Sequence, residues 1–281
     1  MKANLKIKCG RHLLNLNKRP YIMGVLNVTP DSFSDGGWYL NTKSAVEHAK
    51  GMVQDGADIV DIGGESSRPG AEPVPVQVEL ERVLPVIKAL SKKIDAPISI
   101  DTYKADVAKE ALKAGASIIN DISGLRFDTM MVKVAADADA PVIIMHMKGT
   151  SMDMQKRPVY KDVVKEILLF FKERICFAVK NGIKKNKIII DPGIGFGKTV
   201  KHNLEIIKRL SEFKILGVPM LLGPSRKSFI GKILNVDIDN RLEGTAAAVA
   251  ISIANGANIV RVHDVKAMAE VARVAEAILR V

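Results

Sequence analysis

The sequence predicts an α/β protein folded as a (β/α)8 TIM barrel that is preceded by a short N-terminal β-hairpin. Eight short apolar runs alternate with stretches of helical periodicity along the 281 residues. These runs contain few polar residues, as expected for parallel strands that are buried on both faces. A doubly wound open sheet is the competing architecture, but eight alternations of strand and helix in a chain of this length favour a closed barrel. Active sites of such barrels lie at the carboxyl ends of the strands.

Each element can be located from its own pattern. Residues 1–18 alternate between apolar and polar around Gly10, which predicts the hairpin. The barrel strands are expected at residues 21–27, 58–62, 97–101, 117–120, 141–145, 187–191, 219–222 and 258–262. Helices are expected between them, because apolar residues recur there at three or four residue spacing, as they do from Val163 to Ala178. No linker rich in Pro, Gly or Ser divides the chain, so we expect a single domain, 1–281.

Three of the strands follow a Gly-Ala pair at the same offset, in residues 56–61, 115–120 and 256–261. Glycine suits the left-handed conformation that ends a helix, and the β-branched residues that follow suit a buried strand. The last residue of each repeat is polar: Asp61, Asn120 and Arg261. We expect these polar residues where the strands stop, so that they converge on one mouth of the barrel.

Composition narrows the possible classes of function. The apolar runs are far shorter than the roughly 20 residues of a membrane-spanning helix, and the first residues lack the apolar segment of a secretory signal, so we expect a cytoplasmic protein with no membrane contact. The net charge of +11 is spread along the chain and aromatic residues make up only 5%, which argues against nucleic-acid binding and favours attraction of anionic substrates. Cys9 and Cys176 form no CxxC pair, which argues against a zinc site and a disulfide scaffold.

The glycine-rich segments do not match the common nucleotide or hydrolase motifs. In residues 191–199, a Walker A loop would need glycine at Pro192, and a dinucleotide fingerprint would need glycine at Lys198. In residues 223–227, Lys227 occupies the second glycine of a nucleophile elbow. The sequence therefore supports neither those modes of nucleotide binding nor serine hydrolysis.

Polar residues at the predicted strand ends suggest a binding site. Asp101, Asn120 and Asp191 could together hold a flat ligand that carries ring N–H and acceptor groups. The alternative is that each one caps the helix that follows, which Asp and Asn often do.

Arg261 and His263 share a strand face, which suits a phosphate or pyrophosphate, although a structural salt bridge with Asp264 is the alternative. Further donors come from Ser67 and its neighbours in the loop before Pro69. The polar, glycine-tipped loop at residues 27–37 has the profile of a mobile lid.

Eight motifs in order resemble those of the dihydropteroate synthase family, at residues 24–37, 61–70, 100–102, 120–124, 145–146, 191–198, 225–228 and 261–264. The resemblance covers essentially the whole chain after the hairpin. It implies a TIM barrel that condenses 6-hydroxymethyl-7,8-dihydropterin pyrophosphate with p-aminobenzoate by an SN1-like loss of pyrophosphate. The products are 7,8-dihydropteroate and pyrophosphate, in folate biosynthesis. It also implies a homodimer and competition by sulfonamides for the p-aminobenzoate site.

The resemblance assigns roles residue by residue. The pterin would contact Asp101, Asn120, Ile122, Met145, Asp191, Phe196 and Lys227. The pyrophosphate would contact Ser67, Arg261 and His263, and Asn27 would ligate Mg²⁺. Phe33, Arg68, Pro69 and Ser228 would border p-aminobenzoate. The residues implied to take part in catalysis are Asp35, Lys227, Arg261 and His263. Ser67 departs from the family pattern, which often has Thr there, and Asp61 receives no role.

The residue types suit this chemistry. An arylamine nitrogen has a free lone pair, so the difficult step is the expulsion of pyrophosphate, which Arg261, His263 and Mg²⁺ would stabilise electrostatically. Two other functions compete with this interpretation. A methyltetrahydrofolate-binding methyltransferase has a similar pterin pocket but does not need Arg261 with His263 or Lys227. A pterin-binding or nucleic-acid-binding protein without activity is the other alternative.

Overall fold

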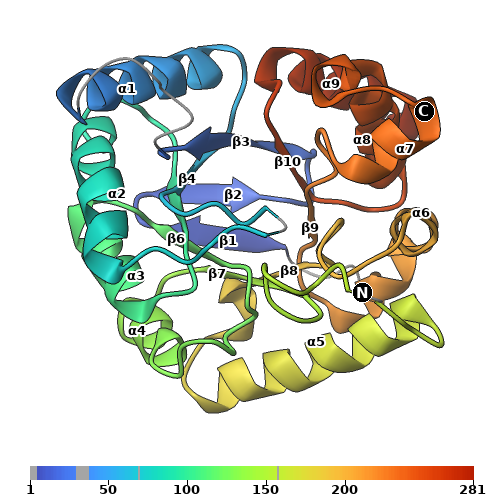
Figure 1. Ribbon diagram of the computed structural model, residues 1–281, viewed down its shortest axis with the longest axis horizontal. Coiled ribbons are helices and arrows are strands. Elements are labelled where there is room, and N and C mark those ends of the chain that lie inside the picture. The colour runs from blue at the N-terminus through green and yellow to red at the C-terminus, as the bar shows by residue number, and fades with distance from the viewer. Residues whose placement is uncertain (1–4, 30–37, 69, 157) are drawn as a thin grey trace.

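Eight parallel strands close into a barrel that is surrounded by helices (Figure 1), as predicted. The structure is a computed structural model, and it describes residues 5–29, 38–68, 70–156 and 158–281. Neighbouring strands pair in the order β8-β7-β6-β5-β4-β3-β10-β9. A parallel bridge between Ile190 and Met220 joins the two ends of this series and closes the barrel.

The strands lie within one or two residues of the predicted segments. They are β3 (Tyr21–Asn27), β4 (Ile59–Gly63), β5 (Ile98–Asp101), β6 (Ile118–Asp121), β7 (Val142–Met145), β8 (Ile188–Asp191), β9 (Leu221–Leu222) and β10 (Ile259–Val262). The seventh barrel strand is shorter than expected. Pro219 has no N–H to donate, and the N–H of Met220 donates to the Asn258 side chain instead of to a neighbouring strand.

The helices are α1 (Trp38–Gln54), α2 (Val76–Leu90), α3 (Ala105–Ala114), α4 (Met131–Asp137), α5 (Val163–Lys180), α6 (Val200–Lys208), α7 (Ser228–Leu234), α8 (Leu242–Ala254) and α9 (Val265–Arg280). Gly56, Gly115 and Gly256 follow α1, α3 and α8 with φ of 106°, 120° and 107°. These positive φ angles confirm that the Gly-Ala repeat marks the turn from helix to strand. None of the helices in the described ranges is long and apolar enough to cross a membrane.

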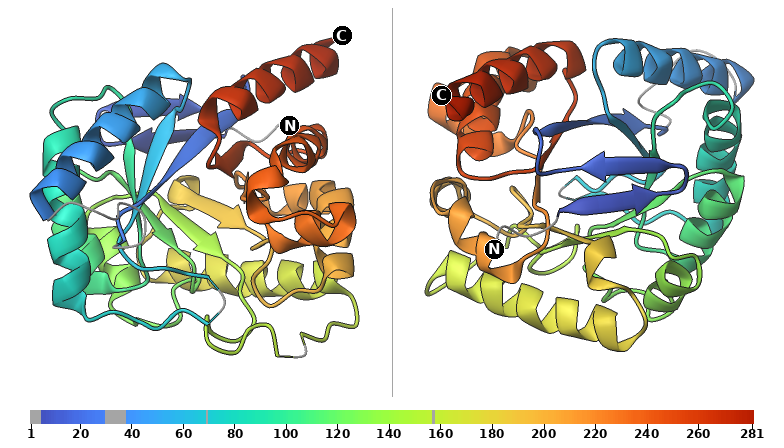
Figure 2. Two further views of the ribbon diagram at one scale, coloured as in Figure 1. Left: turned by 45° about the horizontal axis from the view of Figure 1, so that its top comes forward. Right: turned by 180° about the vertical axis from the view of Figure 1, so that it is seen from behind.

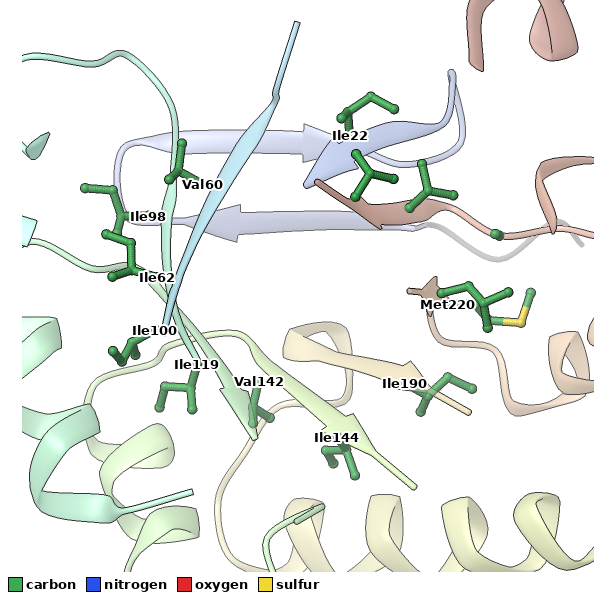
Figure 3. Packing of buried hydrophobic residues seen from close by; sticks show 14 of the residues in the cluster. Ile22, Val60, Ile62, Ile98, Ile100, Ile119, Val142, Ile144, Ile190 and Met220 are labelled. Atoms are coloured by element: carbon green, nitrogen blue, oxygen red, sulfur yellow. The ribbon is translucent and has the colours of Figure 1, made fainter. Parts of the chain in front are cut away.

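Side chains on the barrel strands alternate between two cores. Outward-facing residues such as Ile22, Val60 and Ile119 pack against the surrounding helices (Figure 3). Inward-facing residues form a second cluster inside the barrel, which contains Met23, Ile59, Ile118, Ile143, Ile189, Leu221 and Ile259. The period of two along each strand therefore separates an outer core from an apolar barrel floor.

The hairpin closes one end of the barrel. Strands β1 (Lys6–Cys9) and β2 (His12–Asn15) pair antiparallel across Gly10, and they lie across the barrel when it is seen from behind (Figure 2). Ile7, Cys9 and Leu14 of the hairpin belong to the inner cluster. The predicted hairpin therefore covers the apolar floor and leaves the opposite end, where the strands finish, for ligands.

The next inward position on several strands is polar. Asp61, Asn120, Asp191 and Arg261 each follow an apolar floor residue by two positions. Asp191 ends its strand, as predicted. Asp61 and Arg261 do not, because β4 continues to Gly63 and β10 to Val262. These two charged side chains are consequently deeper in the barrel than the sequence pattern indicated.

We expect Ile7→Ala to lower the free energy of unfolding by about 2–5 kcal/mol, because it opens a cavity in the covered floor. Ile7 is 1% exposed. The matched control is Leu13→Ala on the same hairpin, where the side chain is 63% exposed, and this change should alter stability by no more than about 0.5 kcal/mol. Urea unfolding of both variants measures the difference. Equal losses would contradict a role for the hairpin as a buried cover.

Candidate active site

Arg261 lies at the centre of the polar cluster inside the barrel. Its Nε donates to Oδ2 of Asp61 at 2.6 Å, and its Nη2 donates to Oδ2 of Asp101 at 2.7 Å. The amide nitrogen of Asn120 donates to the same Asp61 oxygen at 3.0 Å. Four side chains from four strands are thus connected by hydrogen bonds. The alternative of a structural salt bridge between Arg261 and Asp264 is excluded, because Asp264 forms a two-point ion pair with Arg226.

Asp101, Asn120 and Asp191 do not act as helix caps. The N-cap of α3 is Lys104 and that of α4 is Met130, both without a side-chain cap bond. Thr199, not Asp191, caps α6. Asp191 instead accepts the N–H of Gly193 at 2.7 Å through one oxygen. The capping alternative is therefore excluded for these three residues, and their remaining polar atoms are available to a ligand.

Burial changes the acidity of these groups. Removal from water raises the pKa of Asp101 to about 7, partly offset by Arg261, and burial also raises that of Asp191 to about 6. Burial and the charge of Arg261 lower the pKa of Lys227 to about 8. The site therefore holds two carboxyl groups and an amine whose charges change near neutral pH, which is a feature of functional sites.

An apolar wall borders the polar cluster. Ile122 and Met145 pack with Met147 and Met154, and Phe196 packs against this group. The ammonium of Lys227 lies 4.2 Å from the centre of the Phe196 ring, a cation–π contact. Gly195 permits this approach, since a Cβ there would lie 3.1 Å from Cδ of Lys227. A flat apolar surface next to hydrogen-bonding groups is suited to a heteroaromatic ring.

The glycine-rich turn after β8 is shaped by close backbone contacts. Gly193 has a φ of +72°, and a Cβ on this residue would lie 2.1 Å from the carbonyl oxygen of His146. Buried Lys198 fixes the same turn, because its ammonium donates to the carbonyl oxygens of His146 and Phe196. The glycines therefore serve the packing of this turn beside the cluster.

His263 is held in one orientation by Ser225. The Ser225 hydroxyl accepts the backbone N–H of His263 at 3.2 Å and lies 3.0 Å from its ring Nδ1. Partial removal of the ring from water and the charge of nearby Arg261 lower the pKa of His263 to about 4, although the residue as a whole is exposed. His263 is therefore neutral at physiological pH and adds no charge to the site.

The loop after β4 lies beside the cluster. Ser67 lines a small cavity together with Asp101 and Ile122, so three predicted ligand residues are brought together. The sequence did not indicate what holds this loop. Partly buried Lys104 bonds to Glu65 of the loop and to Glu79 of α2. The three residues are far apart in the chain, and no spacing signal connects them.

The remaining predicted residues are less closely defined. Arg68 is exposed, and Ser228 is an exposed residue at the start of α7. Phe33, Asp35 and Pro69 lie outside the described residues. Asn27 ends β3, and its side-chain oxygen faces Gly63 on the neighbouring strand. In the described ranges, no three His, Cys, Asp or Glu side chains are grouped to hold a metal ion. A single neutral oxygen such as Asn27 fits Mg²⁺, which often enters a site with substrate phosphates and water.

Comparisons with known proteins agree with this geometry. Residues 23–263 match the family model described as pterin binding enzyme. Dihydropteroate synthase from Synechocystis is 51% identical over 96% of this chain and 94% of its own. The Yersinia pestis dihydropteroate synthase in a sulfonamide drug complex has a TM-score of 0.93 and 44% identity over 98% of this chain and 100% of its own. The Xanthomonas albilineans enzyme with 4-aminobenzoic acid has a TM-score of 0.93 and 43% identity, covering 99% of each chain.

We expect Arg261→Ala to lower the free energy of unfolding by about 3–5 kcal/mol, because it leaves the buried Asp61 carboxylate without its cationic partner. Arg11→Ala is the control, since Arg11 also forms an ion pair but its side chain is 65% exposed. That exposed pair should contribute less than about 1 kcal/mol. Chemical denaturation of both variants measures the free energy of unfolding. An equal loss in the two variants would contradict a larger contribution from the buried Arg261 pair.

We expect pterin binding to depend on pH with two limbs. Affinity should fall as the pH drops through about 7 and about 6, because Asp101 and Asp191 become protonated and no longer accept ligand N–H groups. Affinity should fall again above about pH 8, where Lys227 loses its charge. Titration calorimetry with 6-hydroxymethylpterin measures the profile. Asp191→Asn should remove the decrease in affinity near pH 6. A pterin affinity that does not change with pH in the unmodified protein would contradict these assignments.

Proposed function

The chain belongs to the dihydropteroate synthase family, and on this premise we propose how its cluster condenses 6-hydroxymethyl-7,8-dihydropterin pyrophosphate with p-aminobenzoate. The observation that carries the proposal is the position of Arg261. Its guanidinium bonds to Asp101, a predicted pterin contact, and Arg261 lies two residues before His263, which directly follows β10. One cation thus connects the predicted pterin site with the predicted pyrophosphate site.

The pterin is recognised by polar groups on one side and apolar groups on another. Asp101, Asn120 and Asp191 accept or donate hydrogen bonds at the ring edge. Ile122, Met145 and Phe196 pack beside the ring, as their shared apolar cluster supports. Lys227 lies against Phe196 and can reach an acceptor of the pterin from there. A buried site that must pair several polar atoms discriminates strongly against ligands that lack them.

The pyrophosphate is held by Arg261, His263 and Ser67. Arg261 keeps three of its five N–H groups after its bonds to the two aspartates. Neutral His263, in the tautomer that carries its proton on Nε2, would add one N–H. Asn27 would ligate Mg²⁺ that arrives with the pyrophosphate, and the bound ion would supply further positive charge for the leaving group. Stabilisation of developing negative charge is usually the largest contribution to such a reaction.

The reaction proceeds by departure of pyrophosphate before the amine attacks. The electron-rich dihydropterin carries the resulting cationic methylene, and the arylamine nitrogen forms the new C–N bond and then loses its proton. Such a cation reacts with water unless it is covered. The loops at residues 28–39 and 64–75 are assigned this covering role, with Asp35 of the first loop stabilising the cation. Residues 30–37 lie outside the described part of the chain.

The p-aminobenzoate is bordered by Phe33, Arg68, Pro69 and Ser228. Arg68 and Ser228 are exposed, so a second substrate can reach them from solvent. The sulfonamide complex of the Yersinia pestis relative supports competition by sulfonamides for this position.

The chain also pairs as a homodimer through α8 and α9. These adjacent helices carry the exposed apolar side chains of Ile251, Val274 and Ile278, which are 52%, 62% and 70% exposed. Exposed apolar groups on two neighbouring helices favour a protein partner. The cytoplasmic location stays a prediction from the sequence.

We expect the purified protein to release pyrophosphate from the pterin ester only when p-aminobenzoate and Mg²⁺ are both present. Lys227→Met should lower kcat/KM about 10- to 100-fold, because it removes a charged hydrogen-bond donor from the pterin site. The control is Lys232→Met, an exposed lysine on the same helix, which should retain activity. A coupled pyrophosphate assay measures both. Binding of the ester without any release of pyrophosphate would overturn the proposed function.

A further inference from the structure

One acidic side chain inside the barrel has no role in the reaction described so far. Asp61 projects inward from the middle of β4 and is completely buried. Its Oδ2 atom accepts hydrogen bonds from both Arg261 and Asn120. Its Oδ1 atom is buried without a hydrogen-bond partner in the part of the chain that the structure describes. Asp61 therefore connects a residue assigned to the pyrophosphate with one assigned to the pterin.

Stability alone does not account for this residue. A buried ion pair must overcome the cost of removing two charges from water, and well-packed apolar residues often replace such pairs without loss of stability. The preceding inward residue of the same strand, Ile59, is apolar and belongs to the barrel floor. A buried oxygen without a partner adds a further cost. The residue type at position 61 is thus better explained by what its carboxylate does to its neighbours.

The carboxylate fixes the orientation of both neighbours. An ionised carboxylate only accepts hydrogen bonds, so its contact with Asn120 directs the amide nitrogen toward Asp61 and leaves the amide oxygen for another partner. Arg261 is held at two points, at Nε by Asp61 and at Nη2 by Asp101. These two contacts leave Nη1 for an anion. A single residue thereby sets which atoms Asn120 and Arg261 present.

We propose that Asp61 is a positioning residue, which holds Arg261 and Asn120 in the orientation that binds the pterin pyrophosphate ester. The inference rests on the proposed function, because it concerns the residues assigned to that substrate. Without the Asp61 charge, Arg261 keeps Asp101 as its close anionic partner and is free to close onto it as a two-point pair. That pair would occupy the carboxylate that the pterin needs and would turn the guanidinium away from the pyrophosphate.

The test is Asp61→Asn, which keeps the shape of the side chain and removes its charge. We expect the KM for the pterin ester to rise at least tenfold and kcat to fall, while the KM for p-aminobenzoate changes less than twofold. Affinity for 6-hydroxymethylpterin and for inorganic pyrophosphate with Mg²⁺ should both decrease at least tenfold by calorimetry. The unfolding temperature should not fall in parallel, because Asp61→Asn keeps the volume of the side chain and Arg261 keeps Asp101 as an anionic partner.

The pH dependence of 6-hydroxymethylpterin binding distinguishes a positioning role from a purely structural one. Asp61 is one of the negative charges that raise the pKa of Asp101, with Glu79 and Asp121, whereas Arg261 lowers it and Lys227 also interacts with Asp101. Loss of the Asp61 charge removes one repulsion and frees Arg261 to pair with Asp101. Both changes lower the pKa of Asp101. The acidic limb of 6-hydroxymethylpterin binding should therefore move to lower pH in Asp61→Asn.

Ser99→Ala is the matched control. Ser99 pairs in register with Asp61 on the neighbouring strand, is completely buried, and has a hydroxyl without a hydrogen-bond partner in the described chain. It should retain the kinetic constants and the pH profile of the unmodified protein. If Asp61→Asn does not fold, Asp61→Ser is measured in the same assays.

Combination with Arg261→Lys tests whether Asp61 acts through Arg261. The two changes should be strongly non-additive in kcat/KM, since a misplaced guanidinium and an absent one have similar consequences. Unchanged KM values and pH profile in a folded Asp61 variant, or simple additivity with Arg261→Lys, would overturn the inference. Failure of the unmodified protein to release pyrophosphate would instead overturn the proposed function, so the two failures are distinguishable.

Discussion

The ion pairs between Arg261 and the two aspartates inside the barrel are the interaction on which the rest of the site depends. Charges at this depth are stable only when they have partners of opposite sign. Asp61 and Asp101 approach Arg261 from two different strands, so the pairs also fix how these strands present their side chains. The arrangement keeps a cation and several acceptors together in a small volume.

This cluster is possible because the inward-facing residues change from apolar to polar along the strands. The floor is apolar and is covered by the hairpin, with Ile7 packed into it. Two residues further along, the same strand face carries Asp61, Asn120, Asp191 and Arg261. The apolar layer excludes water from below, which strengthens the electrostatic interactions above it. The same layer supplies hydrophobic stabilisation that offsets the cost of the buried charges.

Burial influences the protonation of the residues in the site as much as their residue type does. Partial removal from water and the charge of Arg261 lower the pKa of His263, so it stays neutral beside the permanent cation Arg261. Burial raises the pKa values of Asp101 and Asp191 and lowers that of Lys227, so that all three pKa values lie close to neutral pH. A ligand that pairs with these groups therefore determines their protonation when it binds, and pterin and pyrophosphate recognition become linked through Arg261.

Local patterns in the sequence predict the barrel, its strands and the residues at its mouth, because a period of two and helix-ending glycines are local properties of the chain. The sequence also identified the family through motifs that are contiguous in sequence. Which polar groups form hydrogen bonds with one another follows from the folded arrangement of the strands and loops. Asp61 carries the same Gly-Ala offset as Asn120 and Arg261, yet its bonds to both depend on residues 59 and 200 positions away. The same holds for Lys104 with Glu65 and Glu79, since contacts across strands and loops follow from barrel closure and side-chain packing, which no local pattern encodes.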